Sequence, residues 1–564
     1  MAENVWTVGK YLAARLAELN VRHYFTVPGD YNLILLDEFL KLEQLQMVSC
    51  CNELNAGYAA DGYARATGGL GVVVVTYSVG GLSAINAVAG AYAEDLPVVI
   101  VSGGPNTNST AEYELLHHTL GKVDYDYVRD MFKEVTVASL AIRHPTEAAG
   151  QIDFALETAL KARKPVYLEV ACNIASAPLS TPNPRRLFGA QSSDVESLTS
   201  AIEHAATLLN QARKPVVLAG AKLRAADAEA DVHALVHATD YAIAVTPDAK
   251  SYFDEQHPNY MGVYWGPVGT PGCSSIVESA DVCLLLGLVL TDYTTTGHTT
   301  LVDRKKHIDV RTDHVIIGDE CYNDVSMRQF LQTLAGKLKA NNTAVQSYQR
   351  LTADRTRASH TVSDAPLSTR QLFAQIEQLL TPDTAVIAET GDSWFNGIDL
   401  SLPGGCQFEI QMQYGSIGWS VGATLGYCLG SPNRQVIACI GDGSFQLTAQ
   451  EVSTMLRYGA KPIIFLINNG GYTIEVEIHD GPYNTINDWQ YHKLVEVFGG
   501  EKFNGWGCRV TTSEELADAI AKADKHDGLC LIEAQIDRDD CSKNLLEWGA
   551  HVAKNNGRPP RFLP

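Results

Sequence analysis

Two oxygen-bearing side chains stand at opposite ends of one short segment, and their types suit a divalent cation. The segment runs from Gly441 to Glu475 and reads GDGSFQLTAQEVSTMLRYGAKPIIFLINNGGYTIE. Mg2+ takes hard oxygen ligands in a near-ideal octahedron and keeps few protein donors, the rest being water and phosphate. The carboxylate of Asp442, the side-chain amide oxygen of Asn469 and the backbone carbonyl of Gly471 are such donors. These three residues are the predicted metal ligands.

Small residues beside these ligands favour a bound diphosphate. Gly443 and the pair Gly470 and Gly471 let the backbone approach a phosphate closely. Ser444 begins a predicted helix whose free N–H groups favour an anion. GDG alone is a common turn, and its pairing with NNGGYT is what favours a metal and diphosphate site.

The elements that must position these residues are predicted to be two neighbouring strands. Val436 to Ile440 and Pro462 to Ile467 are short apolar runs with a helical pattern between them, which is typical of buried parallel strands. Because such a crossover is almost always right-handed, Asp442 and Asn469 should emerge beside each other at the carboxyl ends of two strands. Ligands of doubly wound sheets bind at such an edge.

Length and patterning predict three α/β units. A chain of 564 residues is too long for one hydrophobic core. Lys-Pro followed by an apolar residue begins a predicted strand at Lys164, Lys214 and Lys461, which we interpret as a common strand entry rather than a true repeat. A Pro-rich stretch over 177–184 indicates one linker, and a polar stretch over 341–368 indicates the second. We predict three doubly wound parallel-sheet domains, over residues 1–180, 190–345 and 365–564.

Charge and composition argue against nucleic acid and membranes as partners. The 65 acidic and 43 basic residues give a formal net charge of -22, which repels phosphate backbones and anionic lipid surfaces. Twelve cysteines are scattered without CxxC pairs, so we expect them to be reduced. The N-terminus shows no export signal, and the apolar run from Val282 to Leu290 is far too short to span a bilayer. We expect a cytoplasmic protein.

Motifs in both outer thirds of the chain resemble those of the thiamine diphosphate-dependent 2-keto acid decarboxylases, and of the pyruvate decarboxylase family in particular. Besides the segment above, they are Val27-Pro28-Gly29-Asp30-Tyr31-Asn32, Cys51-Asn52-Glu53-Leu54-Asn55, Leu116-His117-His118 and Ala388-Glu389-Thr390-Gly391-Asp392-Ser393-Trp394. The resemblance implies thiamine diphosphate and Mg2+ as cofactors. It also implies nonoxidative decarboxylation of pyruvate to acetaldehyde and CO2 through an ylid and an enamine, as in ethanol fermentation.

The resemblance further implies which residues bind the cofactor. Glu53 is expected to hydrogen bond to the ring nitrogen N1' of the aminopyrimidine, and Ile417 to prop the cofactor in its bent form. The other implied contacts are Thr390, Gly391, Asp392, Gly415, Ser416, Gly443, Ser444, Asn469, Gly470, Gly471, Tyr472, Thr473 and Ile474. Because Glu53 and Asp442 stand in different predicted domains, the resemblance implies a site shared by two subunits. A homodimer is then the minimum active unit, and a homotetramer is usual in the family.

The predicted catalytic set is Asp30, Glu53, His117, His118 and Glu475. Decarboxylation needs surroundings that destabilise a carboxylate and a proton donor for the carbanion that forms. Clustered acids repel each other, which keeps one of them protonated near neutral pH. Adjacent histidines do not face the same way on a helix. We therefore favour His118 for the substrate contact and leave His117 open to a structural role.

Three other reactions or roles can be weighed against pyruvate decarboxylation. Trp394, Ile474 and Ile478 are expected to wall a small pocket, which favours pyruvate over indolepyruvate or phenylpyruvate as the substrate. An acetolactate synthase would need a second keto acid and commonly flavin, and nothing in the sequence calls for flavin. A noncatalytic thiamine-binding protein would not need Glu53, His118 and Glu475 together.

Overall fold

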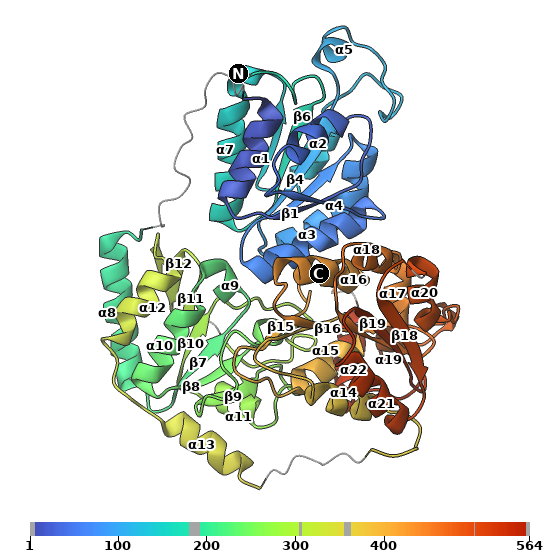
Figure 1. Cartoon of the computed structure of the whole chain (residues 1–564). Coiled ribbons are helices and arrows are strands. Elements are labelled where there is room, and N and C mark those ends of the chain that lie inside the picture. Colours follow the sequence, from blue (N-terminus) through green and yellow to red (C-terminus); the bar gives the residue numbers. More distant parts are fainter. Residues whose placement is uncertain (1–5, 180–191, 304–306, 355–361, 501, 560–564) are drawn as a thin grey trace.

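The three Lys-Pro strand entries become buried central strands of three separate sheets. The computed structural model describes residues 6–179, 192–303, 307–354, 362–500 and 502–559. Within them β6 (Val166–Ala171), β7 (Pro215–Ala219) and β17 (Ile463–Asn468) each have parallel neighbours on both sides, and all their residues are buried. Helices cover both faces of such sheets, which explains the continuous apolar runs. Figure 1 shows the resulting three α/β units, with the N-terminal unit above the other two.

The first unit is built on an all-parallel sheet with the strand order β2-β1-β3-β4-β6-β5. The order reverses direction beside β1, which is where ligands of doubly wound sheets bind. Its other strands are β1 (His23–Thr26), β2 (Gln46–Ser49), β3 (Gly71–Val75), β4 (Val98–Gly104) and β5 (Ala138–Ile142). Its helices are α1 (Val8–Glu18), α2 (Leu33–Leu40), α3 (Glu53–Thr67), α4 (Val79–Ala93), α5 (Thr107–Ala111), α6 (Tyr127–Phe132) and α7 (Pro145–Ala162).

The middle unit differs from the predicted parallel sheet, because its sheet is mixed. The order is β13-β12-β11-β10-β7-β8-β9, and β12 is antiparallel to both β11 and β13. Gly318 and Asp319 join β12 to β13, and a tight turn of this kind can connect only antiparallel strands. Its other strands are β8 (Ala242–Val245), β9 (Tyr260–Val263), β10 (Val282–Leu286), β11 (Ile308–Val310), β12 (His314–Ile317) and β13 (Glu320–Asn323). Its helices are α8 (Val195–Gln211), α9 (Lys222–Ala226), α10 (Glu229–Thr239), α11 (Cys273–Glu278), α12 (Met327–Ala335) and α13 (Thr343–Thr352).

The third unit returns to an all-parallel sheet, in the order β15-β14-β16-β17-β19-β18. Its other strands are β14 (Thr384–Ala388), β15 (Gln407–Glu409), β16 (Gln435–Gly441), β18 (Gly505–Val510) and β19 (Leu529–Gln535). Its helices are α14 (Thr369–Glu377), α15 (Asp392–Asp399), α16 (Trp419–Gly430), α17 (Asp442–Thr448), α18 (Glu451–Arg457), α19 (Thr473–Ile478), α20 (Leu494–Gly499), α21 (Ser513–Ala523) and α22 (Lys543–Asn556).

Helices α3 and α16 join the first unit to the third. They cross so closely that a Cβ atom on Gly426 would lie 1.8 Å from the carbonyl oxygen of Ala59. Only glycine allows two backbones to approach in this way. Because α3 begins at Glu53 and α16 begins just after Ile417, this packing fixes the elements that carry two predicted cofactor residues.

Both predicted linkers touch parts of the chain outside the described residues. The Pro-rich stretch over 177–184 falls largely on 180–191, and the polar stretch over 341–368 includes 355–361. The polar stretch also contains α13, a helix that its composition does not predict, because Ala344 and Val345 are buried against the core of the middle unit. All twelve cysteines are free.

None of the helices in the described ranges is both long and apolar enough to cross a lipid bilayer.

Candidate active site

The predicted metal ligands lie together at the carboxyl edge of the third sheet. β16 and β17 pair in parallel, and Asp442 and Asn469 directly follow them. The Asp442 carboxylate is buried, and its two oxygens accept hydrogen bonds from the N–H groups of Gly443 and Gly470, each at 2.7 Å. Burial raises the pKa of Asp442 to about 6, although these donors favour the carboxylate form.

Three acceptor oxygens converge at this edge. Oδ1 of Asn469 lies 3.3 Å from Oδ1 of Asp442 and 3.2 Å from the carbonyl oxygen of Gly471, while its Nδ2 donates to Oγ1 of Thr473 at 2.5 Å. In the opposite amide orientation the Asn469 NH2 group would donate to both of these oxygens, whereas in this orientation the three oxygens are placed to ligate one cation. Neighbouring ligands of octahedral Mg2+ are about 3 Å apart, which matches this spacing.

The backbone beside the three oxygens leaves no room for a side chain at Gly443 or Gly471. A Cβ atom on Gly443 would lie 2.5 Å from the ring of Tyr472, so any larger residue would displace that ring. Ser444 is buried, and α17 begins at Asp442, two residues earlier than the sequence predicts. Ile474 is also buried, in the first turn of α19.

Asp30, His117 and His118 form a second polar group, in the first unit. Nε2 of His117 lies 2.7 Å from Oδ2 of Asp30, and Nε2 of His118 lies 3.9 Å from Oδ1 of the same carboxylate. The His117 ring also stacks on Tyr31, with the ring centroids 4.9 Å apart. The expectation that the two histidines face different ways is therefore wrong. They lie in a turn and not in a helix, and His118 has a φ of +63°, so both rings reach one carboxylate.

Glu53 is the first residue of α3, and Asn52 caps that helix by accepting a hydrogen bond from the N–H of Asn55 at 2.8 Å. The Glu53 carboxylate is half-buried beside Gly80, where a Cβ atom would lie 3.2 Å from Oε1 of Glu53. No other side chain or N–H group of the described residues bonds to this carboxylate. The start of α3 thus fixes the backbone of Glu53, and its carboxylate is free to bind a ligand.

Glu475 lies on α19, which begins four residues after Asn469. Its side chain is exposed, and its charge adds to the burial that raises the pKa of Tyr293 in the middle unit. The C-terminal helix α22 packs on α19, since a Cβ atom on Gly549 would lie 2.9 Å from the carbonyl oxygen of Glu477. Residues 560–564, which follow α22, lie outside the described residues.

Two loops of the third unit carry the remaining predicted cofactor residues. After Thr390 and Gly391, the Asp392 carboxylate accepts hydrogen bonds from the N–H and the hydroxyl of Ser542, the residue that caps α22. Burial raises the pKa of Asp392 to about 6.

The second loop contains Gly415, Ser416 and Ile417. The Ser416 N–H donates to Oε1 of Gln411 at 2.9 Å, and its hydroxyl lies 2.6 Å from the hydroxyl of Tyr58 in α3. Ile417 is half-buried and belongs to none of the described hydrophobic clusters, so it is not an ordinary core residue.

Trp394 does not wall an open pocket in this chain. Its ring is fully buried in the core shared by the middle and third units, next to Tyr293 at a centroid distance of 6.3 Å. Ile478 packs against the same core. The sequence predicts Trp394 at the wall of the substrate pocket. Full burial between the middle and third units removes more of its apolar surface from water than a place at an open pocket would.

Within one chain the two polar groups are far apart. Figure 1 shows α5, which leads into the histidine turn, at the end of the first unit that points away from α19 and β17. The structure thus brings Asp30, His117 and His118 together, and separately brings Asp442, Asn469, Gly471 and Thr473 together. A single chain does not join the two groups.

Comparison with known proteins finds family models and relatives that match most of this chain. Three thiamine pyrophosphate enzyme models match the chain: the N-terminal TPP binding domain over residues 6–128, the central domain over 202–338 and the C-terminal TPP binding domain over 399–534. Pyruvate decarboxylase 1 of Oryza sativa subsp. indica is 49% identical over 560 residues, which cover 98% of this chain and 92% of that protein. Pyruvate decarboxylase 1 of Pisum sativum is 48% identical, covering 98% and 94%, and pyruvate decarboxylase 2 of Arabidopsis thaliana is 48% identical, covering 98% and 92%.

The chain belongs to the pyruvate decarboxylase family of thiamine pyrophosphate enzymes. The cofactor that this family implies is thiamine diphosphate, with Mg2+ as its usual partner metal. The residues present fit both groups. The oxygens of Asp442, Asn469 and Gly471 are the hard donors that Mg2+ prefers, and the Glu53 carboxylate has no hydrogen-bond partner among the described residues, so it can accept a hydrogen bond from the cofactor.

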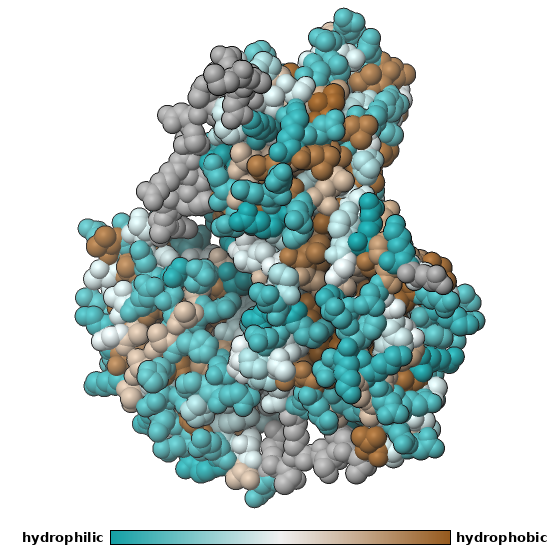
Figure 2. Space-filling model, in the orientation of Figure 1, coloured by the Kyte–Doolittle hydropathy of each residue, from teal (hydrophilic) through white to brown (hydrophobic). Residues whose placement is uncertain are grey.

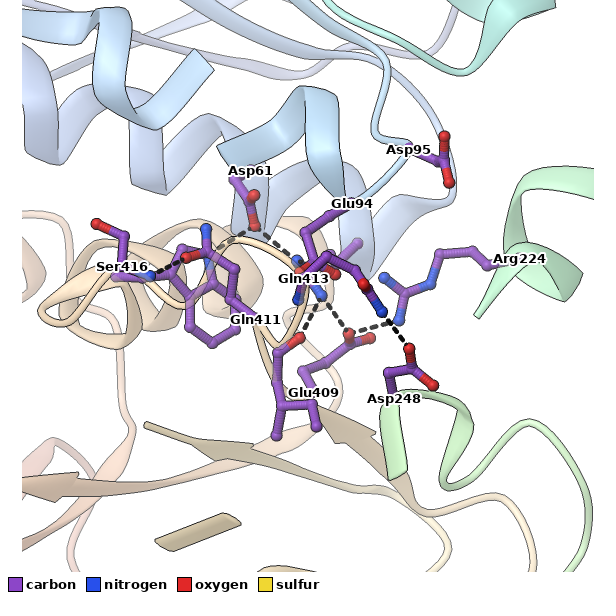
Figure 3. Close-up of polar contacts among 12 residues, drawn as sticks. Asp61, Glu94, Asp95, Arg224, Asp248, Glu409, Gln411, Gln413 and Ser416 are labelled. Atoms are coloured by element: carbon purple, nitrogen blue, oxygen red, sulfur yellow. Dashed lines mark hydrogen bonds and ion pairs between the residues drawn. The ribbon is translucent and has the colours of Figure 1, made fainter. Parts of the chain in front are cut away.

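A buried ion network joins all three units behind the Ser416 loop (Figure 3). Arg65 of α3 contacts Asp61 at 2.7 Å, Glu409 at 3.2 Å and Glu94 at 3.6 Å. Arg224 of the middle unit also reaches Glu409, at 2.5 Å. The network therefore holds β15 and the loop after it, which leads to Ser416, against the other two units.

Replacing Arg65 by Met is expected to destabilise the chain strongly. The Arg65 side chain is 2% exposed, and its loss would leave three buried carboxylates with one remaining cation among them, Arg224. Removing one partner of a buried ion pair typically costs about 3–5 kcal/mol. Urea unfolding followed by tryptophan fluorescence measures the change, because Trp419 stacks on Arg65. Lys461→Met, which removes an exposed ion pair with Asp527, should cost less than about 1 kcal/mol. Equal midpoints for the two variants would contradict this reading.

Glu94 is expected to make stability fall as the pH rises. Burial raises its pKa from 4.5 to about 7, although Arg65 opposes this. The folded chain therefore keeps a proton between these pH values that the unfolded chain releases, so the contribution present below about pH 4.5 is lost by about pH 7. It is worth up to about 3 kcal/mol. Glu94→Gln should flatten the pH dependence of urea unfolding between pH 5 and 7, whereas the exposed Glu43→Gln should not. An unchanged slope in Glu94→Gln would refute the assignment.

Sequence reasoning missed several residues that position the site, including Arg65, Glu94, Glu389 and Glu409. Arg65 and Glu409 are 344 residues apart in the chain, and no local pattern links them. Glu389 stands inside a motif quoted above and directly follows a buried strand. That position at the carboxyl end of a strand could have indicated that Glu389 lies near the site.

Proposed function

We propose that this chain decarboxylates pyruvate to acetaldehyde and CO2 without oxidation, using thiamine diphosphate and Mg2+. The observation that carries the proposal is the convergence of the Asp442, Asn469 and Gly471 oxygens at a glycine-lined sheet edge. The names of the relatives supply the keto acid, pyruvate. Ethanol fermentation in the cytoplasm is the setting we propose, and the twelve free cysteines support a reducing compartment.

The third unit would hold the cofactor and its metal. Asp442, Asn469 and Gly471 would bind Mg2+. Bound thiamine diphosphate supplies an electron sink that accepts the electron pair of the breaking carbon–carbon bond. The remaining contacts would come from Thr390, Gly391, Asp392, Gly415, Ser416, Ile417, Gly443, Ser444, Gly470, Tyr472, Thr473 and Ile474.

The first unit and α19 would handle protons and the substrate. The Glu53 carboxylate would hold a proton at the ring nitrogen of the aminopyrimidine and so would favour one tautomer of that ring. Asp30, His117 and His118 share protons within one hydrogen-bonded group, which can hold the keto acid and donate a proton. Glu475, on α19 beside the predicted metal ligands, would serve as the acid that holds a proton for the product carbon.

A homodimer with shared sites is the minimum assembly we propose, and a tetramer the assembly in solution. The separation of the histidine group from the metal ligands within one chain supports a shared site (Figure 1). Apolar side chains around the histidine turn are open to solvent in the single chain, with Tyr113 76%, Leu115 63% and Leu120 65% exposed. Figure 2 shows hydrophobic side chains gathered on one flank of the first unit and at its junction with the third. A second copy would cover such surface.

Proton NMR of the purified protein with pyruvate, thiamine diphosphate and Mg2+ tests the reaction. Acetaldehyde that forms only when the cofactor is present is the expected result. A parallel sample with phenylpyruvate tests the substrate, and faster formation of phenylacetaldehyde would refute the preference for pyruvate. Acetolactate as the main product would indicate a carboligating synthase, and no product at all would refute the proposed activity.

A further inference from the structure

Glu389 is a fully buried carboxylate that the proposed reaction does not use. It directly follows β14, and its backbone N–H donates to the carbonyl oxygen of Cys439 in β16 at 3.0 Å. Only N–H and O–H groups of the described residues bond to its carboxylate. A buried negative charge without a cation is costly unless several donors stabilise it.

Four donors from two loops meet this carboxylate. Oε1 accepts a hydrogen bond from the N–H of Thr390 at 2.8 Å. Oε2 accepts from the N–H of Gly418 and the N–H of Ser420, each at 3.1 Å, and from the Ser420 hydroxyl at 2.6 Å. Burial raises the pKa of Glu389, and these four donors oppose that shift.

The two loops are those that carry the predicted cofactor residues. Gly418 directly follows Ile417 and caps α16, whose first N–H groups have no partner within the helix and favour an anion. The carbonyl oxygen of Gly418 accepts from Oγ1 of Thr448 at 2.7 Å, and Thr448 ends α17, the helix that begins at Asp442. Glu389 therefore lies where the Thr390 loop, the Ile417 turn and the metal-binding helix meet.

We propose that Glu389 is a positioning residue for the cofactor, which fixes the Ile417 turn and the Thr390 loop relative to each other. The inference rests on the proposed function, because it takes both loops to contact thiamine diphosphate. Ile417 can hold the cofactor in its bent form only if the backbone at Ile417 is rigid. The Glu389 carboxylate supplies that rigidity through bonds that are individually stronger than neutral ones.

Glu389→Gln is the direct test, since it keeps the shape and removes the charge. The NH2 group of the new amide would replace one carboxylate oxygen. It would then face either the N–H of Thr390 or the N–H groups of Gly418 and Ser420, and in both cases donor would meet donor. Calorimetric titration of the apoprotein with thiamine diphosphate at fixed Mg2+ should give a Kd that is weaker by about tenfold or more. Hydrogen exchange should become faster in the peptides that contain 390–392 and 415–420, and not elsewhere.

Two further variants separate positioning from general stability. Ser420→Ala removes one donor of four and should weaken the Kd by about threefold. Asp153→Asn alters a buried carboxylate of the first unit that binds Tyr11 and Arg15, and it should lower thermal stability without changing the Kd.

Several outcomes would overturn the inference. One is a Glu389→Gln variant with the Kd and the hydrogen-exchange pattern of the parent chain. Another is an Asp153→Asn variant whose Kd is weakened as much as that of Glu389→Gln. If Glu389→Gln does not fold, Ser420→Ala decides, and a parent-like Kd there would count against the role. The titration does not depend on the keto acid. A parent chain that binds the cofactor tightly but forms no acetaldehyde would refute the proposed function and leave this inference standing.

Discussion

Glu475→Gln is expected to bind thiamine diphosphate and Mg2+ as the parent chain does, and to lose most of its turnover. The exposed Glu475 contacts none of the predicted metal ligands, so the cofactor site should stay intact. The amide cannot donate a proton in the way a carboxylic acid does, and loss of general acid catalysis typically costs about 100-fold or more in kcat. Acetaldehyde release at saturating cofactor measures kcat, and calorimetric titration measures cofactor binding.

Glu477→Gln is the matched control for this variant, because it lies two residues further along the same short helix. Burial and the nearby charges of Asp539 and Asp480 raise the pKa of Glu477. Glu477 therefore interacts with these two acids and not with the predicted catalytic set. This variant should keep the turnover of the parent. Normal acetaldehyde release by Glu475→Gln would refute the role of Glu475, and an equal loss in both variants would show damage to α19 instead.

The approach of Asp442 to Asn469 could be predicted from the sequence, because both follow neighbouring strands of one local unit. Two apolar runs define β16 and β17, and the handedness of a crossover fixes which ends of these strands meet. Asp442 and Asn469 follow those strands directly, so their approach needs no knowledge of distant contacts. The prediction of strands after the three Lys-Pro pairs is confirmed for the same reason, because each pair begins a fully buried central strand.

The histidine turn shows where local reasoning fails. A helical pattern would have sent the two rings in different directions, but the positive φ of His118 turns its ring back toward Asp30. Non-glycine residues rarely adopt a positive φ, and the sequence composition does not predict it at His118. The mixed middle sheet has a similar origin, because the short connections 311–313 and 318–319 set the directions of β12 and β13.

The residues that hold the site rigid were the least predictable. Arg65, Glu94 and Glu409 come from separate segments, and each alone is an ordinary charged residue of a helix or a strand end. Charged residues are seldom fully buried, so the sequence favours an exposed position for each. Only the tertiary fold shows that the guanidinium groups of Arg65 and Arg224 face three buried carboxylates.

Glu53→Gln is expected to fold and to lose turnover by about 100-fold or more, because the amide cannot exchange a proton with the aminopyrimidine ring. The described residues around Glu53 do not bond to its carboxylate, so the substitution should disturb few contacts. Cofactor binding should weaken, and the loss in kcat should persist at saturating cofactor. Full turnover restored by excess thiamine diphosphate would show that Glu53 only binds the cofactor.

Mixing the two inactive variants, Glu53→Gln and Glu475→Gln, tests whether the site is shared between subunits. In a two-fold dimer with shared sites, a mixed dimer has one site with both defects and one site with neither. Unfolding and refolding an equimolar mixture should therefore restore about a quarter of the parent activity. If each site were built from one chain, every site would carry one defect and the mixture would stay inactive. A mixture of Glu53→Gln with itself, taken through the same treatment, sets the baseline. Because the histidine group and the metal ligands lie far apart within one chain, recovery is the expected result.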